Sequence, residues 1–446
     1  MDLFGTDGVR GEVNKDITPE LALKLGKATK IITEKDDAIL ICTDTRKSGL
    51  TLGYALASGV SSIGRNGYLL DVLPTPAVPI LMDKFDAKAG AVVSASHNLA
   101  RDNGIKFFNS RGLKLMPNVE EKLEKFIVAQ ERSALANWED IGDIEAVENS
   151  GELYLNSLRE RFAGELPDLS EFELVLDCGH GATYRIGPKL FEELGAEVYE
   201  IGVNPNGFNI NQNCGSTSLQ RLKGEVVSRK ADLGVAFDGD GDRALFVDEK
   251  GNEVDGDRVL YLVTKWLLDE GKLEPPTVVS TVMSNLGLEK SLSSLGVDLV
   301  RTQVGDKYVA QEMMEKGAII GGEQSGHVIF REINTTGDGL VTALMVLRIL
   351  RETGNNISEL AGDMLQYPQI LYNVPTDNKE DFQANSEIQE EVSRWEEELG
   401  DGGRILVRPS GTQDVIRVMV ESRTQKRAET VAKELGQSID KELNGN

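Results

Sequence analysis

The residues best suited to chemistry are three alternating aspartates, Asp238, Asp240 and Asp242, in the stretch DGDGDR. Glycines at the two intervening positions let the chain curl, so that all three carboxylates can face one point. Hard carboxylate oxygens at this density suit Mg²⁺ or Ca²⁺. The stretch therefore predicts a metal site rather than a solvated acidic turn.

The same stretch also fits part of an EF-hand calcium loop. Asp238, Asp240 and Asp242 fall on its first, third and fifth positions, and Glu249 falls on its twelfth. Arg243, however, occupies the sixth position, where that loop needs glycine. The flanking runs LGVAF and ALFV are typical of strands, whereas an EF-hand lies between helices. We therefore reject the EF-hand and expect a metal loop between two strands.

A second candidate follows the apolar run GAVV, which ends on the polar residues SASHN at positions 94–98. A strand that stops at small polar residues delivers them to the rim of a sheet, where Ser96 and His97 are available for chemistry. The hydrolase elbow G-x-S-x-G is absent, because Ser94 and Asn98 stand in place of its glycines. A phosphate on Ser96 would instead present anionic oxygens to the metal loop, which joins both motifs in one mechanism.

The stretch GGEQSGH, residues 321–327, combines a carboxylate, an amide, a hydroxyl and an imidazole in a glycine-rich loop. Such a set of groups suits the hydroxyls of a sugar. A lone histidine is more often structural than catalytic, and His180 in CGHGAT fits that description. Polar neighbours surround His327, so we expect it to contribute to a binding site.

The stretch RPSGTQDVIR, residues 408–417, has the composition of a phosphate cradle. Ser410 and Thr412 supply hydroxyls, and Gly411 lets backbone N–H groups approach an anion. Arg408 and Arg417 can each grip phosphate oxygens through two hydrogen bonds. A turn that only joined two strands would need no paired arginines, so we predict an anion site.

The elements that must position these motifs form an internal repeat. Residues 37–112, 172–252 and 276–339 share one order: strand, helix, strand, helix, strand, polar motif, final strand. Alternating strands and helices predict βαβ units in a largely parallel sheet, and the short step to the last strand predicts an antiparallel hairpin. The motifs SASHN, DGDGDR and GGEQSGH then occupy equivalent places and share a cleft if the three domains face each other.

The tail after residue 366 differs, because it reads as a smaller α+β domain. The predicted fold class is therefore α/β, with three repeated mixed-sheet α/β domains plus a smaller C-terminal α+β domain around a central cleft. We place the phosphoserine loop in a domain of residues 1–150 and the metal-binding loop in residues 151–252. The sugar-binding loop falls in residues 253–366, and the phosphate site falls in residues 367–446.

Composition narrows the class of partner. The chain has 446 residues, a formal charge of −25, 40% hydrophobic residues and three scattered cysteines. The negative charge argues against nucleic acid or an anionic membrane as partner. Because the start MDLFGTDGVRG does not resemble a secretory signal, we expect a cytoplasmic protein whose partner is a small molecule.

The motifs FGTDGVRG, SASHN, NGIKFF, DGDGDR, GGEQSGH and RPSGT stand in one order along the whole chain. In this the chain closely resembles the α-D-phosphohexomutase superfamily, and within it the phosphoglucosamine mutases. Two positions depart from the usual pattern of that family. Leu99 follows SASHN in place of proline, and Gln413-Asp414 follow SGT in place of Glu-Pro.

The resemblance implies four domains around a central cleft, an active-site phosphoserine at Ser96 and one Mg²⁺ per chain. It places that ion on Asp238, Asp240, Asp242 and an oxygen of the Ser96 phosphate. The resemblance also implies sugar contacts from Glu323, Ser325 and His327. The distal phosphate of the substrate would lie on the cradle, with ligands from Arg408, Ser410, Gly411, Thr412 and Arg417.

The hypothesis that follows is transfer of phosphate between O6 and O1 of a hexosamine phosphate through a hexose 1,6-bisphosphate, which also acts as activator. Arg10, Lys106 and Arg243 would neutralise charge around the transferred group, and either Lys106 or His327 would relay the proton. The candidate catalytic residues are Ser96, Arg10, His97, Lys106, Arg243 and His327. A phosphoglucomutase or phosphomannomutase, a metal-dependent phosphatase and a non-catalytic binder stay open, as does the choice between monomer and homodimer.

Overall fold

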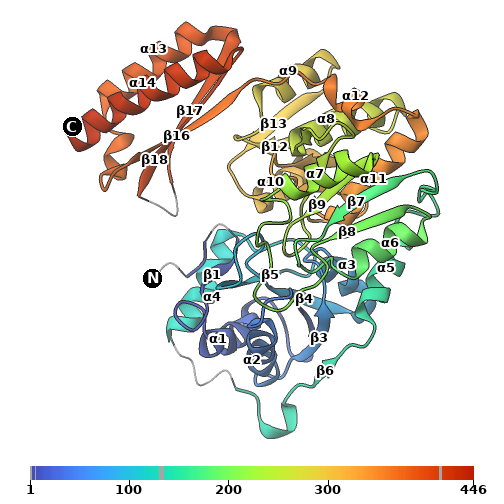
Figure 1. Cartoon of the computed structure of the whole chain (residues 1–446). Helices are drawn as coiled ribbons and strands as arrows, with labels where there is room; N and C mark the ends of the chain where they lie inside the picture. Colours follow the sequence, from blue (N-terminus) through green and yellow to red (C-terminus); the bar gives the residue numbers. More distant parts are fainter. Residues whose placement is uncertain (1–2, 6, 130–134, 411–413, 446) are drawn as a thin grey trace. The chain divides into compact units, whose positions relative to one another are not determined.

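A computed structural model describes residues 3–5, 7–129, 135–410 and 414–445. The chain divides into two compact units. The first comprises Met1–Met283 and Val297–Asp363, and the second comprises Ser284–Gly296 and Met364–Asn446. Figure 1 shows them coloured along the sequence. Within the described ranges, no helix has the length and apolar character that crossing a membrane requires.

The first sheet has six strands in the order β1-β5-β4-β2-β3-β6. Along the chain these are β1 (Val9–Glu12), β2 (Ala38–Thr43), β3 (Asn66–Val72), β4 (Ala87–Val93), β5 (Asp102–Phe108) and β6 (Ile144–Ala146). Its helices are α1 (Pro19–Ala28), α2 (Gly49–Ser61), α3 (Ala77–Met82) and α4 (Pro117–Ala129). Every residue of β2 is buried, as expected of a central strand whose two faces are both covered. Leu25 of α1 and Leu56 of α2 share one apolar core with Ile39 and Ile41 of this strand.

Helix α5 (Ser150–Arg161) leads into the second sheet, whose strand order is β11-β10-β9-β7-β8. Its strands are β7 (Glu173–Asp177), β8 (Glu197–Ile201), β9 (Leu233–Phe237), β10 (Ala244–Val247) and β11 (Glu253–Val254). Helices α6 (Ile186–Glu193) and α7 (Gln220–Arg229) belong to the same region. Leu222 and Val226 of α7 pack against Val175 and Ala236 of the central strands.

The third sheet has the order β13-β12-β14-β15. Its strands are β12 (Thr277–Thr281), β13 (Asp298–Thr302), β14 (Ile320–Gly322) and β15 (Val328–Phe330). The accompanying helices of the first unit are α8 (Gly256–Asp269), α10 (Asp306–Lys316), α11 (Gly339–Thr353) and α12 (Ile357–Gly362). Helix α9 (Leu286–Ser294) lies between β12 and β13 in sequence but packs with the second unit.

The predicted repeat is confirmed. The orders β5-β4-β2-β3, β10-β9-β7-β8 and β15-β14-β12-β13 are the same arrangement three times. Within each of these four-stranded arrangements, the three strands that come first in the chain pair in parallel, and the fourth pairs antiparallel with the third. The polar motifs therefore occupy the same hairpin in each sheet. The sequence pattern did not predict the edge strands β1, β6 and β11, because each is at most four residues long.

The second unit contains a three-stranded antiparallel sheet in the order β16-β18-β17. Its elements are β16 (Gln369–Pro375), α13 (Ser386–Leu399), β17 (Gly403–Pro409), β18 (Val415–Ser422) and α14 (Gln425–Asn444). Val418 and Val420 of β18 share an apolar core with Leu435 and Ile439 of α14. This sheet with two helices confirms the predicted smaller α+β domain.

Candidate active site

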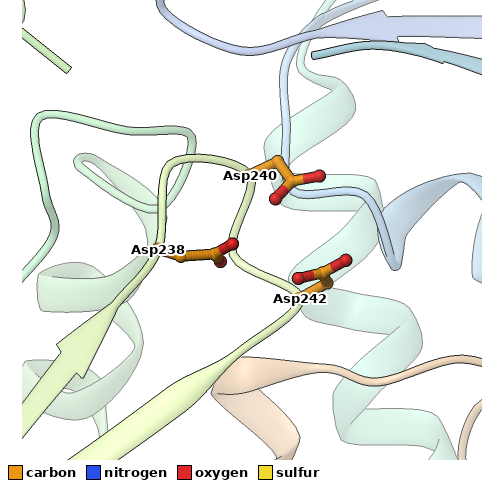
Figure 2. Close-up of side chains that lie close together, drawn as sticks. All are labelled: Asp238, Asp240 and Asp242. Carbon is orange, nitrogen blue, oxygen red and sulfur yellow. The ribbon is translucent and has the colours of Figure 1, made fainter. Parts of the chain in front are cut away.

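The three aspartates of DGDGDR lie in the hairpin between β9 and β10, where their carboxylates face a common space (Figure 2). Their ligand atoms lie within 4.8 Å of one another, and all three residues are buried. Gly241 has a φ of +67°, which glycine adopts without strain and which lets the loop curl. Oδ1 of Asp240 and Oδ1 of Asp242 are buried without a hydrogen-bond partner among the described residues. Orphaned carboxylate oxygens of this kind fit a divalent cation.

The charges of the triad are unevenly compensated. Burial, together with repulsion from Asp242 and Asp240, raises the pKa of Asp238 well above its ordinary value. Burial also acts to raise the pKa of Asp240, but Lys106 and the Thr75 hydroxyl hold that pKa below its ordinary value. For Asp242 burial is again opposed, by Lys106 and His327, and its pKa is well below the ordinary value. The triad therefore carries negative charge that a bound cation would share with Lys106.

Ser96 faces this triad from the hairpin between β4 and β5. Its Oγ donates a hydrogen bond to Oδ2 of Asp238 at 2.6 Å, and its backbone N–H donates to Oγ of Ser94 at 2.9 Å. The residue is buried and has a φ of +49°, a left-handed conformation that is unusual for serine. Strained backbone of this kind persists only where the surroundings enforce it, and it concentrates at functional sites.

Two basic residues approach the triad from the first sheet. Nζ of Lys106, on β5, lies 2.6 Å from Oδ2 of Asp240 and 3.5 Å from Oδ2 of Asp242. Although burial acts to lower it, the pKa of Lys106 is raised well above its ordinary value, chiefly by Asp240 and Asp7. Arg10, on β1, pairs with Asp7, and its pKa is raised against the effect of burial by Asp7 and Asp240. Both side chains stay positively charged beside the aspartates.

Arg243 and His97 bring the metal loop and the serine loop together. Nη1 of Arg243 lies 3.4 Å from Nδ1 of His97, and Nε of Arg243 lies 3.7 Å from Oδ1 of Asp242. Burial and the positive charges of Arg243 and Arg10 lower the pKa of His97 to about 4. The imidazole of His97 is therefore neutral at physiological pH and can accept a hydrogen bond from the guanidinium.

His327 is buried, with 1% of its side chain exposed. Its Nε2 accepts a hydrogen bond from the backbone N–H of Gly337 at 2.9 Å, and its Nδ1 lies 3.7 Å from Oδ2 of Asp242. Oε1 of Glu323, on the same loop, accepts a hydrogen bond from the backbone N–H of Gly305 at 3.1 Å. Oγ of Ser325 is buried and has no partner among the described residues. The structure thus ties His327 to the aspartate site, whereas the Ser325 hydroxyl still has its hydrogen-bonding capacity to offer.

The predicted phosphate cradle belongs to the second unit. Arg408 of β17 stands directly opposite Arg417 of β18, and burial followed by the charge of Arg417 lowers the pKa of Arg408. The backbone N–H of Ser410 donates to the carbonyl of Val415 at 2.9 Å. Opposed like charges on one sheet are destabilising, and an anion between them would relieve the repulsion. Gly411 and Thr412 lie outside the described residues.

Sequence reasoning missed several residues of the site. Thr75, just after β3, donates from Oγ1 to Oδ2 of Asp240 at 2.5 Å. Nζ of Lys114 bridges Oδ1 of Asp7 at 2.8 Å and Oδ2 of Asp306 at 2.6 Å. The sequence signal for Thr75 was its position just after a strand of the parallel sheet. The signal for Asp7 was its place within the motif FGTDGVRG. A serine hydroxyl among buried carboxylates and cations is suited to the transfer of a phosphoryl group, in which charge neutralisation and positioning do most of the work.

Four family models match the chain in sequence order. They are described as phosphoglucomutase/phosphomannomutase alpha/beta/alpha domain I (residues 1–134), domain II (152–251), domain III (255–367) and the C-terminal domain (371–437). Each model covers the central strands of one sheet, and the edge strands β6 and β11 lie outside the matched ranges.

Curated relatives match the chain over its whole length. A phosphoglucosamine mutase from Carboxydothermus hydrogenoformans is 46% identical over 443 residues, which cover 98% of this chain and 99% of the relative. A phosphoglucosamine mutase from Clostridium acetobutylicum is 45% identical, with 99% of each chain covered.

Solved structures share the fold. A phosphoglucomutase/phosphomannomutase family protein from Burkholderia thailandensis superimposes with a TM-score of 0.83 at 23% identity, over 99% of this chain and 98% of that protein. N-acetylphosphoglucosamine mutase from Aspergillus fumigatus, solved in complex with GlcNAc-6P and magnesium, gives a TM-score of 0.69 at 17% identity, over 99% and 96% of the two chains.

Proposed function

The chain belongs to the phosphoglucomutase/phosphomannomutase family, and we propose that within it this protein is a phosphoglucosamine mutase that interconverts glucosamine 6-phosphate and glucosamine 1-phosphate. The observation that carries the chemistry is the 2.6 Å hydrogen bond between Oγ of Ser96 and Oδ2 of Asp238. It joins a nucleophilic hydroxyl to an acidic triad within a buried, charged site. The choice of an amino sugar rests on the curated relatives, which carry that name at up to 46% identity.

Asp238, Asp240 and Asp242 are the residues that would hold one Mg²⁺. The Oδ1 atoms of Asp240 and Asp242, which accept no hydrogen bond among the described residues, support this assignment, and the Aspergillus protein of the same fold was solved with magnesium. When bound, the ion supplies positive charge to the oxygens of the transferred phosphoryl group.

Ser96 carries the phosphoryl group between turnovers in the proposed reaction. A sugar hydroxyl oxygen forms a bond to phosphorus while the bond from phosphorus to Oγ of Ser96 breaks. The hydroxyl proton leaves to a base, and Oγ of Ser96 takes up a proton as it departs. The resulting hexosamine 1,6-bisphosphate turns around and returns its other phosphate to Ser96. Lys106, Arg10 and Arg243 neutralise the phosphoryl oxygens during both transfers.

The sugar and the phosphate that is not transferred need partners of their own. Ser325 supplies a hydroxyl without a partner among the described residues, and Glu323 a carboxylate on the same loop. The facing arginines Arg408 and Arg417, with Ser410, form a cationic surface suited to the distal phosphate. We assign Gly411 and Thr412, which lie outside the described residues, to this cradle from the sequence alone.

The test is to follow glucosamine 6-phosphate, glucose 6-phosphate and mannose 6-phosphate by phosphorus NMR, with Mg²⁺ and a trace of hexose 1,6-bisphosphate. A 1-phosphate signal that grows fastest from the glucosamine compound is expected. Faster conversion of glucose or mannose phosphate would make the protein a phosphoglucomutase or phosphomannomutase instead. Release of inorganic phosphate alone would indicate a phosphatase, and binding without turnover would indicate a non-catalytic binder.

Ser96→Ala removes the proposed acceptor of the phosphoryl group and should abolish conversion of all three sugars. The matched control is Ser58→Ala, because the Ser58 hydroxyl donates to the carbonyl of Tyr54 on the exposed surface of α2. Full activity of Ser96→Ala would refute the mechanism.

A further inference from the structure

The guanidinium of Arg46 is fully buried behind the serine loop. Arginine has five N–H donors, and here each of them has an acceptor. Nε donates to Oδ2 of Asp44 at 2.8 Å. The four remaining N–H groups donate to backbone carbonyls of the serine loop and of the first residue of β5: those of Ser96 (3.0 Å), Asn98 (2.8 Å), Leu99 (2.6 Å) and Asp102 (3.1 Å).

Asn211 reaches the same loop from the second sheet's side. Its Nδ2 donates to the carbonyl of Ser96 at 2.8 Å and to the carbonyl of Asn98 at 3.0 Å. Its own backbone N–H is fixed by the carbonyl of Gly179 at 2.8 Å. The two carbonyls thus each accept hydrogen bonds from two different domains. Gly239 packs directly against the Ser96 carbonyl. A Cβ at position 239 would lie 2.5 Å from that carbonyl oxygen, so a larger residue does not fit there.

These hydrogen bonds act on the segment whose conformation aims the nucleophile. The φ of Ser96 is +49°, and in this conformation its Oγ donates to Oδ2 of Asp238 at 2.6 Å. A serine released from such restraints relaxes towards right-handed or extended backbone. Fixing the Ser96 carbonyl from two sides prevents that rotation.

We propose that Arg46 is a positioning residue, which together with Asn211 clamps the carbonyls of Ser96 and Asn98 and so holds the Ser96 hydroxyl in line with the metal site. The effect of this clamp on catalysis rests on the proposed function, whereas its effect on the conformation of the serine loop does not. The Arg46 side chain is fully buried, and its contribution is the alignment of Ser96 with Asp238.

The alternative is that Arg46 only compensates the buried charge of Asp44. A lysine would serve that purpose, because it keeps the positive charge. It has one nitrogen with three donors, however, and cannot reach four carbonyls spread over residues 96–102. Arg46→Lys therefore separates the two roles.

The experiment compares Arg46→Lys with Arg65→Lys in the full-length protein. Arg65 is a matched control because it also holds backbone carbonyls of the first domain, those of Ile63 (2.6 Å) and Thr33 (3.1 Å), near the start of β3 and away from the serine loop. The first measurement is hydrogen–deuterium exchange of the peptide that covers residues 94–103. The second is the rate constant for transfer of phosphate from Ser96 to glucosamine 6-phosphate in a single turnover.

Arg46→Lys should raise hydrogen–deuterium exchange in the 94–103 peptide about tenfold. It should also lower the transfer rate constant by about 10²-fold, because a misplacement of about 1 Å has that effect on a reaction of bound groups. The KM should stay within about twofold of the parent value. Arg65→Lys should change neither quantity. Unchanged exchange in a folded Arg46→Lys protein would overturn the clamp, whether or not phosphate is transferred.

Asn211→Ala provides a second route if Arg46→Lys does not fold. It removes one of the two donors to each carbonyl and should raise exchange in the same peptide by a smaller factor. Loop exchange and transfer rate equal to the parent would overturn the proposal. Failure of the parent to transfer phosphate from Ser96 would instead refute the proposed function. The exchange measurement would still show whether Arg46 and Asn211 restrain the serine loop.

Discussion

Thr75 shows how one hydroxyl can set the geometry of a metal site. Its Oγ1 donates to Oδ2 of Asp240, while Oδ1 of that carboxylate has no hydrogen-bond partner among the described residues and stays available to a cation. The backbone N–H of Thr75 also donates to the carbonyl of Asp240 at 2.8 Å, so the two residues are tied at two points. Residues that orient a metal ligand without touching the metal affect metal affinity strongly.

Thr75→Val keeps the shape of the side chain but removes this hydrogen bond. We expect the affinity for Mg²⁺ to fall by about tenfold, because the Asp240 carboxylate loses one of the two groups that orient it and keeps only the contact of its Oδ2 with Lys106. Titration calorimetry of Mg²⁺ binding measures the effect directly. Thr33→Val is the control, since the Thr33 hydroxyl donates to the carbonyl of Thr29 in the same domain. Equal Mg²⁺ affinity of Thr75→Val and the parent would show that Asp240 needs no such support.

Asp338 links two helices of the first unit. It is the N-cap of α11, where Oδ1 accepts hydrogen bonds from the backbone N–H groups of Leu340 and Val341. Its Oδ2 accepts one from the Tyr154 hydroxyl of α5 at 2.6 Å. Burial raises the pKa of Asp338 to about 6, in spite of these hydrogen bonds.

An aspartate whose pKa is higher in the folded than in the unfolded chain binds more protons when folded. The stabilisation that Asp338 gains by binding this proton in the folded state is complete below about pH 4, and it is lost as the pH rises through about 6. The asparagine of Asp338→Asn does not titrate. The free energy of unfolding of the parent, measured relative to that of this variant, should therefore fall by roughly 1 kcal/mol between about pH 5 and 7.5. Thermal unfolding of both proteins across this range tests the prediction. A difference that does not change with pH would contradict it.

At the scale of the whole molecule, the repeated domains could be predicted because their signals are local. Buried strands such as β2 and β9 are short apolar runs, and each polar motif directly follows such a run. Ser96 and the three aspartates were predicted for the same reason, since the groups that define each motif are neighbours in sequence.

The residues that hold those groups could not be predicted from local sequence. Arg46 stands 50 positions before Ser96, Asn211 stands 115 positions after it, and Thr75 is 165 positions from Asp240. Each is a single polar residue without a motif of its own, and its role depends on which domains pack together. The pair Asp44 and Arg46, charged residues just after the buried strand β2, was a signal that points to the same sheet edge.

In the proposed reaction Ser96 carries the phosphoryl group during turnover. This can be measured by treating the protein with glucosamine 1,6-bisphosphate and Mg²⁺, and then mapping phosphate by peptide mass spectrometry before and after addition of glucosamine 6-phosphate. One phosphate is expected, on Ser96, which is absent from Ser96→Ala and is lost from the parent as the sugar bisphosphate forms. A turning-over protein with its phosphate on another residue, or with none, would refute the role of Ser96.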